Sequence, residues 1–404
     1  MADNVRNMKL IAITPTYFYP SEAQAIADAL TAGGFWRVHI RKPGSSVEEI
    51  MRLVEEIPAE FRQRLSLHDH QELAAALGVG GVQLNGRCKD VPEGFTGMIS
   101  RGAHSPAEAV EAVQSADYVL LSPVAPSMSK PGYQPAYSFD ELAAVASEKI
   151  FALGGVTREL LPRIEAAGFG GAALLTDAWR RPIDPEHFAL QFITHPTEAL
   201  DVAEGARLAL EGGCRWIQLR HKDAATETLL DEGSRIAALC REFGATFIID
   251  DHVELVEKLD ADGVHLGQND MPVADARRIL GPRKIIGATA NTFETLLEAA
   301  RAGADYAGVG PFRFTSTKKN LAPTLGLGGY DDIMGECRRN GVRIPVVAIG
   351  GIVPADIPAI LRTGVSGVAI SSTILGSPAP AATTREIINL INNNLHNPEQ
   401  WKNL

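Results

Sequence analysis

The sequence predicts an α/β protein made of two tandem (β/α)8 TIM barrels. Three observations lead to this prediction: a length of 404 residues, a repeat that relates the two halves, and a regular alternation of short apolar segments with longer helical segments. A single hydrophobic core rarely grows beyond about 250–300 residues. A chain of this length is therefore expected to form two domains.

Four motifs of the first half recur in the same order in the second half, and the offset between matching motifs grows from 179 to 196 residues. The pairs are GGFWRVHIRKPG (33–44) with GGCRWIQLRHKD (212–223), LHDHQELAAALGVGGVQL (67–84) with IDDHVELVEKLDADGVHL (249–266), ADYVLLSP (116–123) with ADYAGVGP (304–311), and ALGGVTRELLPRIEAAGFGGAAL (152–174) with AIGGIVPADIPAILRTGVSGVAI (348–370). Insertions in surface loops account for the growing offset. The repeat indicates a tandem duplication, with one barrel at 1–180, a second at 187–404 and a Pro- and charge-rich join at 177–188.

Within each half, short apolar or β-branched runs predict strands, and the Ala-, Leu- and Glu-rich segments between them predict helices. The strands expected in the first half are 9–14, 35–40, 65–68, 81–84, 97–100, 117–121, 150–153 and 171–175. Those expected in the second half are 190–194, 215–219, 246–250, 263–266, 284–288, 305–309, 345–349 and 367–370. Helices are expected between them at 198–211, 226–243, 252–259, 292–302 and 354–363. Eight apolar strands with crossover helices fit a closed parallel barrel better than an open sheet.

The composition restricts the class of protein and its partners. A hydrophobic content of 45% with 22% charged residues is typical of a globular chain, and a net charge of −11 argues against nucleic acid or an anionic membrane as the main partner. The four cysteines are widely separated, which favours reduced residues over a disulfide framework or a zinc site. No window approaches 18 consecutive apolar residues and the N-terminus has no signal-peptide pattern, so we expect a cytoplasmic protein that acts on small molecules.

In a (β/α)8 barrel, functional residues lie at the C-terminal ends of the strands and in the loops that follow them. In the second half, Gly350-Gly351 follows the seventh strand and Ser371-Ser372 follows the eighth. Backbone N–H groups of glycine turns and hydroxyl groups together make an anion site, so these residues predict a phosphate site. The loop PFRFTSTKKN (311–320) adds hydroxyl donors and two ammonium groups, although a solvated basic loop would also explain it.

A second group of polar residues follows the second, third and fourth strands. Gln218, Arg220 and Lys222 alternate along one strand, which places them on one side at the barrel mouth. Asp251 and Asp270 follow neighbouring strands, and two carboxylates facing several cations suit Mg²⁺ bridged to a substrate diphosphate. Two structural alternatives stay open: ion pairing for the cations, and a turn or helix cap for Asp270.

These residues resemble thiamine phosphate synthase across nearly the entire second half. The segments QLRHK, IIDDHVELVEKLDADGVHLGQND, GATANT, the T-S-T-K-K loop, AIGGI and VAISS occur in the family's order and spacing. The resemblance implies a transferase that joins 4-amino-2-methyl-5-pyrimidinylmethyl diphosphate to 4-methyl-5-(2-phosphoethyl)thiazole, or to its carboxylated tautomer. Pyrophosphate leaves first to give a pyrimidinylmethyl cation, and the product is thiamine phosphate.

The resemblance also implies site residues. It assigns the Mg²⁺ ligands to Asp251 and Asp270. It assigns the pyrimidine diphosphate contacts to Gln218, Arg220, Lys222, Thr289 and Lys318, of which the last four are the predicted catalytic residues. It assigns the thiazole phosphate contacts to Thr315, Thr317, Gly351, Ser371 and Ser372. Asp250 stands where the family usually has Asn, and an Asp cannot donate a hydrogen bond unless it is protonated. Asp250 is counted with the substrate-binding residues, and both added metal affinity and altered pyrimidine recognition stay open.

The first half keeps the phosphate features and loses the diphosphate features. Ser127, Ser129, Lys130 and Gly155 match the phosphate residues of the second half. By contrast, His39 replaces Gln218, Pro43 replaces Lys222 and Cys88 replaces Asp270, while Arg41 and Asp69 remain. His104 matches the position of the general base in the related thiazole tautomerases. The first half is therefore interpreted as a tautomerase-like domain or as a structural relic.

Two other classes of function remain for the second half. A sugar-phosphate isomerase or aldolase would need a Schiff-base Lys or a Glu base at a strand end, and neither is apparent in 187–404. A non-enzymatic sensor of thiamine precursors would bind ligands without releasing pyrophosphate. The repeat also leaves open an intramolecular contact between the barrels or a homo-oligomer.

Overall fold

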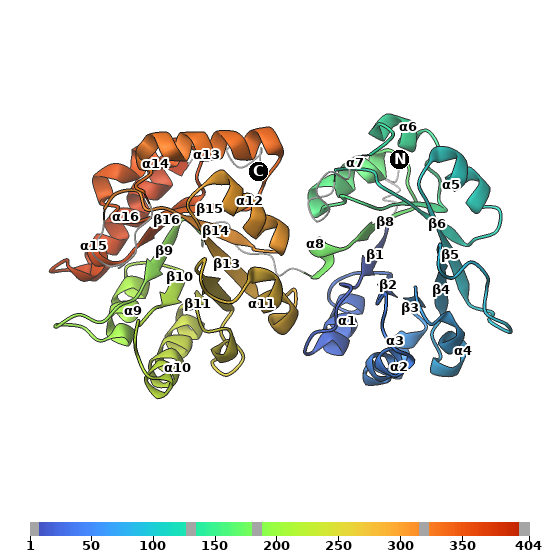
Figure 1. The fold of residues 1–404 in the computed structure, drawn as a ribbon, viewed down its shortest axis with the longest axis horizontal. Coiled ribbons are helices and arrows are strands. Elements are labelled where there is room, and N and C mark those ends of the chain that lie inside the picture. Colours follow the sequence, from blue (N-terminus) through green and yellow to red (C-terminus); the bar gives the residue numbers. More distant parts are fainter. Residues whose placement is uncertain (1–7, 127–134, 180–187, 315–322, 396–404) are drawn as a thin grey trace, which may run out of the picture. The chain divides into compact units, whose positions relative to one another are not determined.

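The structure, a computed structural model, describes residues 8–126, 135–179, 188–314 and 323–395. The chain divides into two compact units, one formed by Met1–Arg180 and the other by most of Arg181–Leu404. Each unit contains a closed barrel of eight parallel strands surrounded by helices (Figure 1). The predicted fold class of two tandem (β/α)8 barrels is confirmed. The expected join at 177–188 lies largely outside the described residues.

In the first unit the strands run in chain order around the barrel, and β1 pairs with β8 to close it. The strands are β1 (Lys9–Ile13), β2 (Arg37–Ile40), β3 (Leu65–Leu67), β4 (Gly81–Leu84), β5 (Met98–Ala103), β6 (Tyr118–Leu121), β7 (Ile150–Ala152) and β8 (Gly171–Leu174). The helices are α1 (Glu22–Leu30), α2 (Val47–Glu56), α3 (Ala59–Arg62), α4 (Ala74–Leu77), α5 (Pro106–Ala112), α6 (Phe139–Ala143), α7 (Leu161–Ala166) and α8 (Thr176–Trp179).

The second unit repeats this order and closes through β9 and β16. Its strands are β9 (Leu190–Ile193), β10 (Trp216–Leu219), β11 (Thr246–Asp250), β12 (Gly263–Leu266), β13 (Ile285–Ala290), β14 (Tyr306–Val309), β15 (Val346–Ile349) and β16 (Gly367–Ile370). Its helices are α9 (Val202–Glu211), α10 (Thr226–Phe243), α11 (Val273–Leu280), α12 (Phe293–Ala302), α13 (Gly326–Asn340), α14 (Ile357–Arg362), α15 (Ser372–Leu375) and α16 (Pro380–Leu395). No helix of the described residues is long and apolar enough to span a bilayer.

The predicted helix at 252–259 is much shorter than expected, and α9 begins four residues later than the predicted 198–211. The segment 252–259 forms only a 3-10 helix at Val253–Leu255, followed by turns. Asp251 and Asp260 flank the segment with left-handed φ angles of 65° and 49°. These two left-handed residues bound the segment, because an α-helix cannot continue through them.

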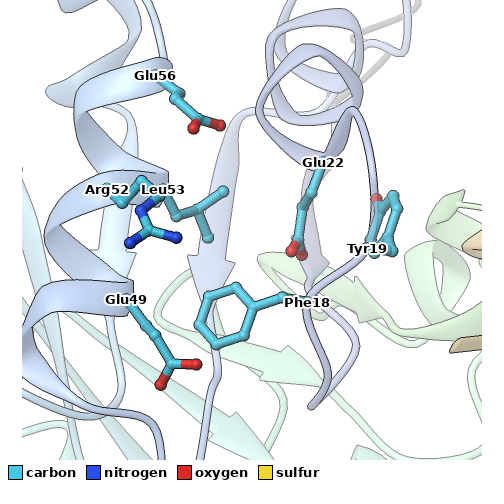
Figure 2. A pocket seen from close by; sticks show the side chains of 7 residues that line it. All are labelled: Phe18, Tyr19, Glu22, Glu49, Arg52, Leu53 and Glu56. Atoms are coloured by element: carbon cyan, nitrogen blue, oxygen red, sulfur yellow. The ribbon is translucent and has the colours of Figure 1, made fainter. Parts of the chain in front are cut away.

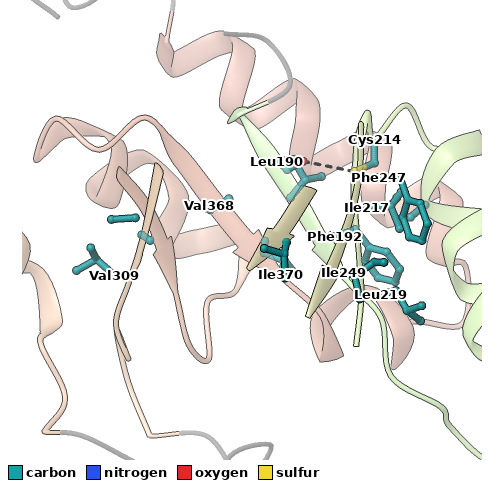
Figure 3. Packing of buried hydrophobic residues seen from close by; sticks show 14 of the residues in the cluster. Leu190, Phe192, Cys214, Ile217, Leu219, Phe247, Ile249, Val309, Val368 and Ile370 are labelled. Carbon is teal, nitrogen blue, oxygen red and sulfur yellow. Dashed lines mark hydrogen bonds between the residues drawn. The ribbon is translucent and has the colours of Figure 1, made fainter. Parts of the chain in front are cut away.

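Side-chain alternation along the strands separates two apolar layers. Ile217 and Leu219 of β10 point out of the barrel and pack in the layer between strands and helices (Figure 3). Trp216 points inward and packs with Ile248 and Tyr306 inside the barrel. Burying a large apolar side chain contributes about 1.5–3 kcal/mol, which fixes this register because a slip by one residue would reverse the faces. Gln218 belongs to the inward set and lies nearer the C-terminal end than Trp216.

The interior of the first barrel contains a buried polar network as well as apolar side chains. His39 Nε2 lies 2.6 Å from the Tyr118 hydroxyl, and His39 Nδ1 lies 2.9 Å from His68 Nε2. Two neutral imidazoles satisfy this chain of hydrogen bonds, with one proton between the two rings and one between His39 and Tyr118. Burial lowers the pKa of His68 to about 3, with help from the charges of Arg41 and Arg87, and burial lowers that of His39 well below its ordinary value.

These histidines predict that the protein loses stability in mild acid. The folded state binds fewer protons than the unfolded chain below about pH 6.5, so their contribution is complete above that pH and falls as the pH falls. We expect the free energy of unfolding to drop by about 1–3 kcal/mol between pH 6.5 and 5.5 on their account. Urea unfolding at both pH values checks this, and His68→Gln is expected to flatten the dependence. His252→Gln, a change at an exposed histidine, serves as the control, and equal slopes for both variants would contradict the assignment.

Candidate functional site

The C-terminal ends of β10 and β11 bring three predicted substrate residues against Asp250. Gln218 Nε2 donates a hydrogen bond of 2.6 Å to Asp250 Oδ1. Arg220 Nε and Lys222 Nζ lie 3.4 and 3.5 Å from Asp250 Oδ2, and Lys222 also donates to Asp251. The structure thus places Gln218, Arg220 and Lys222 on one side, as the strand period predicts. The asparagine expected at position 250 is replaced by a carboxylate that engages all three.

The electrostatics of this group depend on burial and charge together. Burial and the neighbouring Asp251 carboxylate raise the pKa of Asp250, against the opposing effect of Lys222 and Arg220. Burial acts to lower the pKa of Lys222, but the hydrogen bond to Asp251 and the charges of both carboxylates outweigh it, and the pKa is raised. Lys222 therefore stays cationic and remains half exposed, where a ligand can reach it.

Asp251 and Asp270 form a carboxylate pair beside these cations. Asp251 has a φ of 65°, and its carboxylate is hydrogen-bonded to that of Asp270. Burial and Asp251 raise the pKa of Asp270, whereas for Asp251 the hydrogen bonds from Lys222 and Asp270 outweigh burial and lower the pKa. Asp270 Oδ2 also accepts a hydrogen bond of 2.7 Å from the Gly267 amide, so the turn expected as an alternative is present.

This donor set fits a hard divalent cation. Two carboxylates close enough to share a proton can hold a cation in its place, and Mg²⁺ typically uses one or two carboxylates together with substrate phosphates. Within the described ranges there is no group of three or more His, Cys, Asp or Glu side chains that could hold a metal. Asp251 and Asp270 would hold the ion, and oxygens of the substrate and water would complete the coordination.

A hydrogen-bonded chain inside the second barrel ends at Thr289 on β13. Gln191 Nε2 donates to the Tyr306 hydroxyl at 3.0 Å, and the same hydroxyl lies 3.0 Å from His265 Nδ1. If Tyr306 donates to Nδ1, the proton of His265 is on Nε2, which lies 3.0 Å from Thr289 Oγ1. Thr289 then accepts from His265 and can donate its own proton to a ligand at the strand end.

The predicted phosphate residues of the second unit gather at the ends of β15 and β16. Gly350 and Gly351 have φ angles of 103° and 66°, which favour glycine. A Cβ on Gly351 would lie 2.5 Å from Arg313 Cγ, so no other residue fits without displacement. Ser371 directly follows β16, and Ser372 begins the short helix α15. These positions are consistent with an anion site at this end of the barrel.

His195, which follows β9, was not predicted from the sequence. Its Nδ1 lies 2.7 Å from Ser371 Oγ, and Ser371 Oγ donates to the Ile193 carbonyl at 2.5 Å. Ser371 must therefore accept from His195 Nδ1–H, which leaves His195 Nε2 as an acceptor. Burial and the charge of Arg220 lower the pKa of His195. The available signal was its place directly after a strand, where site residues are expected.

Several predicted residues lie outside the described residues. These are Thr315, Thr317 and Lys318 of the second unit and Ser127, Ser129 and Lys130 of the first. Their assignments stay predictions.

In the first unit the matching strand ends hold a different set of contacts. Asp69, the counterpart of Asp251, accepts hydrogen bonds from Arg87 Nε at 3.0 Å and Arg87 Nη2 at 2.7 Å. Cys88 takes the place of Asp270. Because Arg87 precedes it, the loop that carries a carboxylate in the second unit carries a cation in the first. Gly155 keeps a φ of 69°, and a Cβ there would lie 2.4 Å from the Ala125 carbonyl oxygen. His104 is exposed, and its Nδ1 lies 3.1 Å from the Ser122 carbonyl.

A cavity of about 200 Å³ in the first unit is separate from these strand-end residues (Figure 2). It is lined by Phe18, Tyr19, Glu22, Glu49, Arg52, Leu53 and Glu56. Glu22 accepts from Lys42 at 2.7 Å, and Lys42 also donates to the carbonyl groups of Pro15 and Tyr17. This buried ion pair anchors the loop after β1, so Lys42 is satisfied internally. None of the predicted site residues lines the cavity.

Comparison with known proteins places these features in one family. The model of the family described as thiamine monophosphate synthase matches residues 10–178 and again residues 190–374. A thiamine-phosphate synthase of Phocaeicola vulgatus is 56% identical over 201 residues, covering 50% of this chain and 97% of that protein. One from Flavobacterium psychrophilum is 45% identical over 191 residues, covering 47% and 93%. The solved thiamine phosphate pyrophosphorylase of Pyrococcus furiosus is 37% identical, with a TM-score of 0.48, and the match covers 52% of this chain and 98% of that one. Because these two matches cover well over half of the chain, the chain belongs to the thiamine monophosphate synthase family.

Proposed function

We propose that residues 187–404 act as a thiamine phosphate synthase, a transferase that joins the pyrimidinylmethyl diphosphate to the thiazole phosphate and releases pyrophosphate. The observation that supports it best is the contact between Lys222 and the Asp251–Asp270 carboxylate pair, with Arg220 and Gln218 alongside. The glycine pair Gly350-Gly351 follows another strand of the same barrel. One strand-end face thus has features for a diphosphate and for a monophosphate, as the two substrates require.

The proposed reaction depends on charge neutralisation more than on a base. The C–O bond to the diphosphate breaks, the pyrimidinylmethyl carbon becomes cationic, and the thiazole ring nitrogen then forms the new C–N bond. Asp251 and Asp270 would hold Mg²⁺, which would supply positive charge to neutralise the diphosphate. Arg220 and Lys222 are positioned to stabilise the negative charge that develops on the departing diphosphate. Thr289 would orient the pyrimidine through its free hydroxyl proton.

A direct assay tests this proposal. The full chain is incubated with both substrates and Mg²⁺, and pyrophosphate and thiamine phosphate are measured together. We expect both products in equal amounts, and neither in the presence of a chelator. A sensor would bind the substrates without producing pyrophosphate, and a sugar-phosphate enzyme would leave them unchanged. Either outcome would overturn the assignment.

Asp250 provides a prediction about specificity. Its carboxylate contacts Gln218, Arg220 and Lys222, so it competes with a diphosphate for the same cations. Asp250→Asn keeps the shape of the side chain and removes this competing charge. The KM for the pyrimidine diphosphate is expected to fall by about tenfold, which is the effect of one modest charge–charge interaction. Steady-state kinetics at saturating thiazole phosphate checks this. If the variant instead loses Mg²⁺ affinity, Asp250 is a metal ligand and this interpretation is wrong.

A second candidate function concerns the first unit, which could be a thiazole tautomerase. The observation that favours it is the 3.1 Å contact between His104 Nδ1 and the Ser122 carbonyl. A carbonyl can only accept, so Nδ1 carries the proton and the exposed Nε2 is left as a base. Conversion of the carboxylated thiazole phosphate between tautomers by the full chain, lost in His104→Gln, would support this. No conversion by the unaltered chain would leave the first unit with a structural role.

A further inference from the structure

The first barrel has the opposite net charge to the second at the same strand ends. In the second barrel, three carboxylates (Asp250, Asp251 and Asp270) face two cations (Arg220 and Lys222), a formal net charge of −1. In the first barrel, the matching positions hold Asp69 and Arg41 together with three uncharged residues, His68, Cys88 and Pro43. Arg87 adds a second cation beside Asp69. One carboxylate then faces two guanidinium groups, a formal net charge of +1.

Arg87 takes over the neutralising role that a metal ion would have there. Its Nε and Nη2 both donate to Asp69 Oδ1, and the Asp69 side chain is only 11% exposed. The single carboxylate is thus paired with Arg87 through Oδ1, its buried Oδ2 has no hydrogen-bond partner among the described residues, and the second carboxylate is absent. A divalent cation would meet one paired carboxylate and the positive charge of Arg87, which is unfavourable.

Among the described residues, no anionic side chain pairs with the guanidinium of Arg41. Arg41 is partly buried, and no hydrogen bond or ion pair of its guanidinium occurs within residues 8–126, 135–179, 188–314 and 323–395. Arg41 and His68 directly follow Ile40 and Leu67, which pair between β2 and β3. Burial, and then the charges of Arg41 and Arg87, lower the pKa of His68. A partly desolvated guanidinium is costly without an anion. Its fork of donors suits the oxygens of a phosphate or carboxylate.

We propose that the strand-end face of the first barrel, at Arg41, His68 and Arg87, binds the anionic group of a phosphorylated small molecule directly, without a metal ion. A phosphomonoester and a diphosphate share the chemistry that these donors recognise. This site lies at the end of the first barrel that corresponds to the diphosphate end of the second, away from the glycine pair Gly154-Gly155. The inference does not depend on whether the second barrel is a synthase.

Cys88 provides a local probe for this site because it follows Arg87 and is partly exposed, whereas Cys214, Cys240 and Cys337 are buried. The full chain, kept in a chelator, is treated with neutral iodoacetamide with and without inorganic pyrophosphate, and alkylation of Cys88 is followed by mass spectrometry. At a pyrophosphate concentration about ten times its Kd, the rate is expected to fall about tenfold because a tenth of the sites remain free. A parallel series with inorganic phosphate shows which anion binds more tightly.

Variants separate this site from the second barrel. Arg41→Gln is expected to raise the pyrophosphate concentration for half-protection about tenfold or more, as the loss of a charged hydrogen bond should. Arg87→Lys, which retains the charge, should keep partial protection, and Arg220→Gln should leave protection unchanged. Circular dichroism checks the fold of each variant. No protection by millimolar phosphate or pyrophosphate, or protection that persists unchanged in Arg41→Gln, would overturn the proposal.

Discussion

Asp270→Ala is expected to reduce the rate of pyrophosphate release by on the order of 100-fold or more, because it removes one of the two carboxylates that would hold the metal ion that neutralises the diphosphate. The change also removes the hydrogen bond between Asp270 and Asp251, so Asp251 keeps its hydrogen bond from Lys222 but loses the one from Asp270. The rate at saturating substrates and a titration with Mg²⁺ measure the effect. The Mg²⁺ concentration for half-maximal rate should rise together with the loss of rate.

Asp275→Ala is the matched control for this variant. Asp275 lies five residues further along the chain, on α11, where it is exposed and pairs with Arg278 at 2.6 Å. The same loss of a carboxylate there should leave the rate and the Mg²⁺ requirement unchanged, since an exposed ion pair contributes about 1 kcal/mol at most. Equal rates for Asp270→Ala and the unaltered protein would show that Asp270 is not a metal ligand.

Arg220→Gln is expected to lower kcat by about 100-fold, a typical effect of removing one charge that stabilises a transition state. Arg220 is only 20% exposed and lies 3.4 Å from Asp250, so it is held at the strand end. The negative charge on the diphosphate oxygen grows as the C–O bond breaks, and the expected loss in kcat therefore exceeds the rise in KM. Single-turnover measurements of pyrophosphate release separate the chemical step from binding.

The control for Arg220 is Arg241→Gln on α10. Arg241 is 63% exposed and lies 3.9 Å from Asp260, which is not a predicted site residue. Its loss should change neither kcat nor KM. If Arg220→Gln raises KM and leaves kcat intact, Arg220 binds the substrate without stabilising the departing diphosphate, and the proposed charge stabilisation would be wrong.

Most of the fold was predictable because barrel strands have a strong pattern. The strands β11, β12 and β16 begin and end where the apolar runs predict, since both faces of a barrel strand are buried. The segment 252–259 could not be predicted, because its helical composition competes with the left-handed residues Asp251 and Asp260, and single-residue φ angles leave little trace in the sequence.

The site was predictable where it depends on position along one strand, and less so where it depends on contacts between distant segments. Gln218, Arg220 and Lys222 come together because they alternate along one strand and its extension. The partners of His195 and Asp69 are Ser371, 176 residues away, and Arg87, 18 residues away. Such pairs depend on barrel closure and loop paths, which periodicity alone does not specify.

The number of metal ions bound per chain distinguishes a metal–diphosphate site in the second barrel alone from one such site in each barrel. Mn²⁺, which accepts the same oxygen ligands as Mg²⁺, is titrated into the full chain with pyrophosphate present, and bound ions are counted by electron paramagnetic resonance. We expect one bound ion per chain in the unaltered protein and none in Asp270→Ala. Two ions per chain, or a single ion that remains in Asp270→Ala, would contradict this expectation.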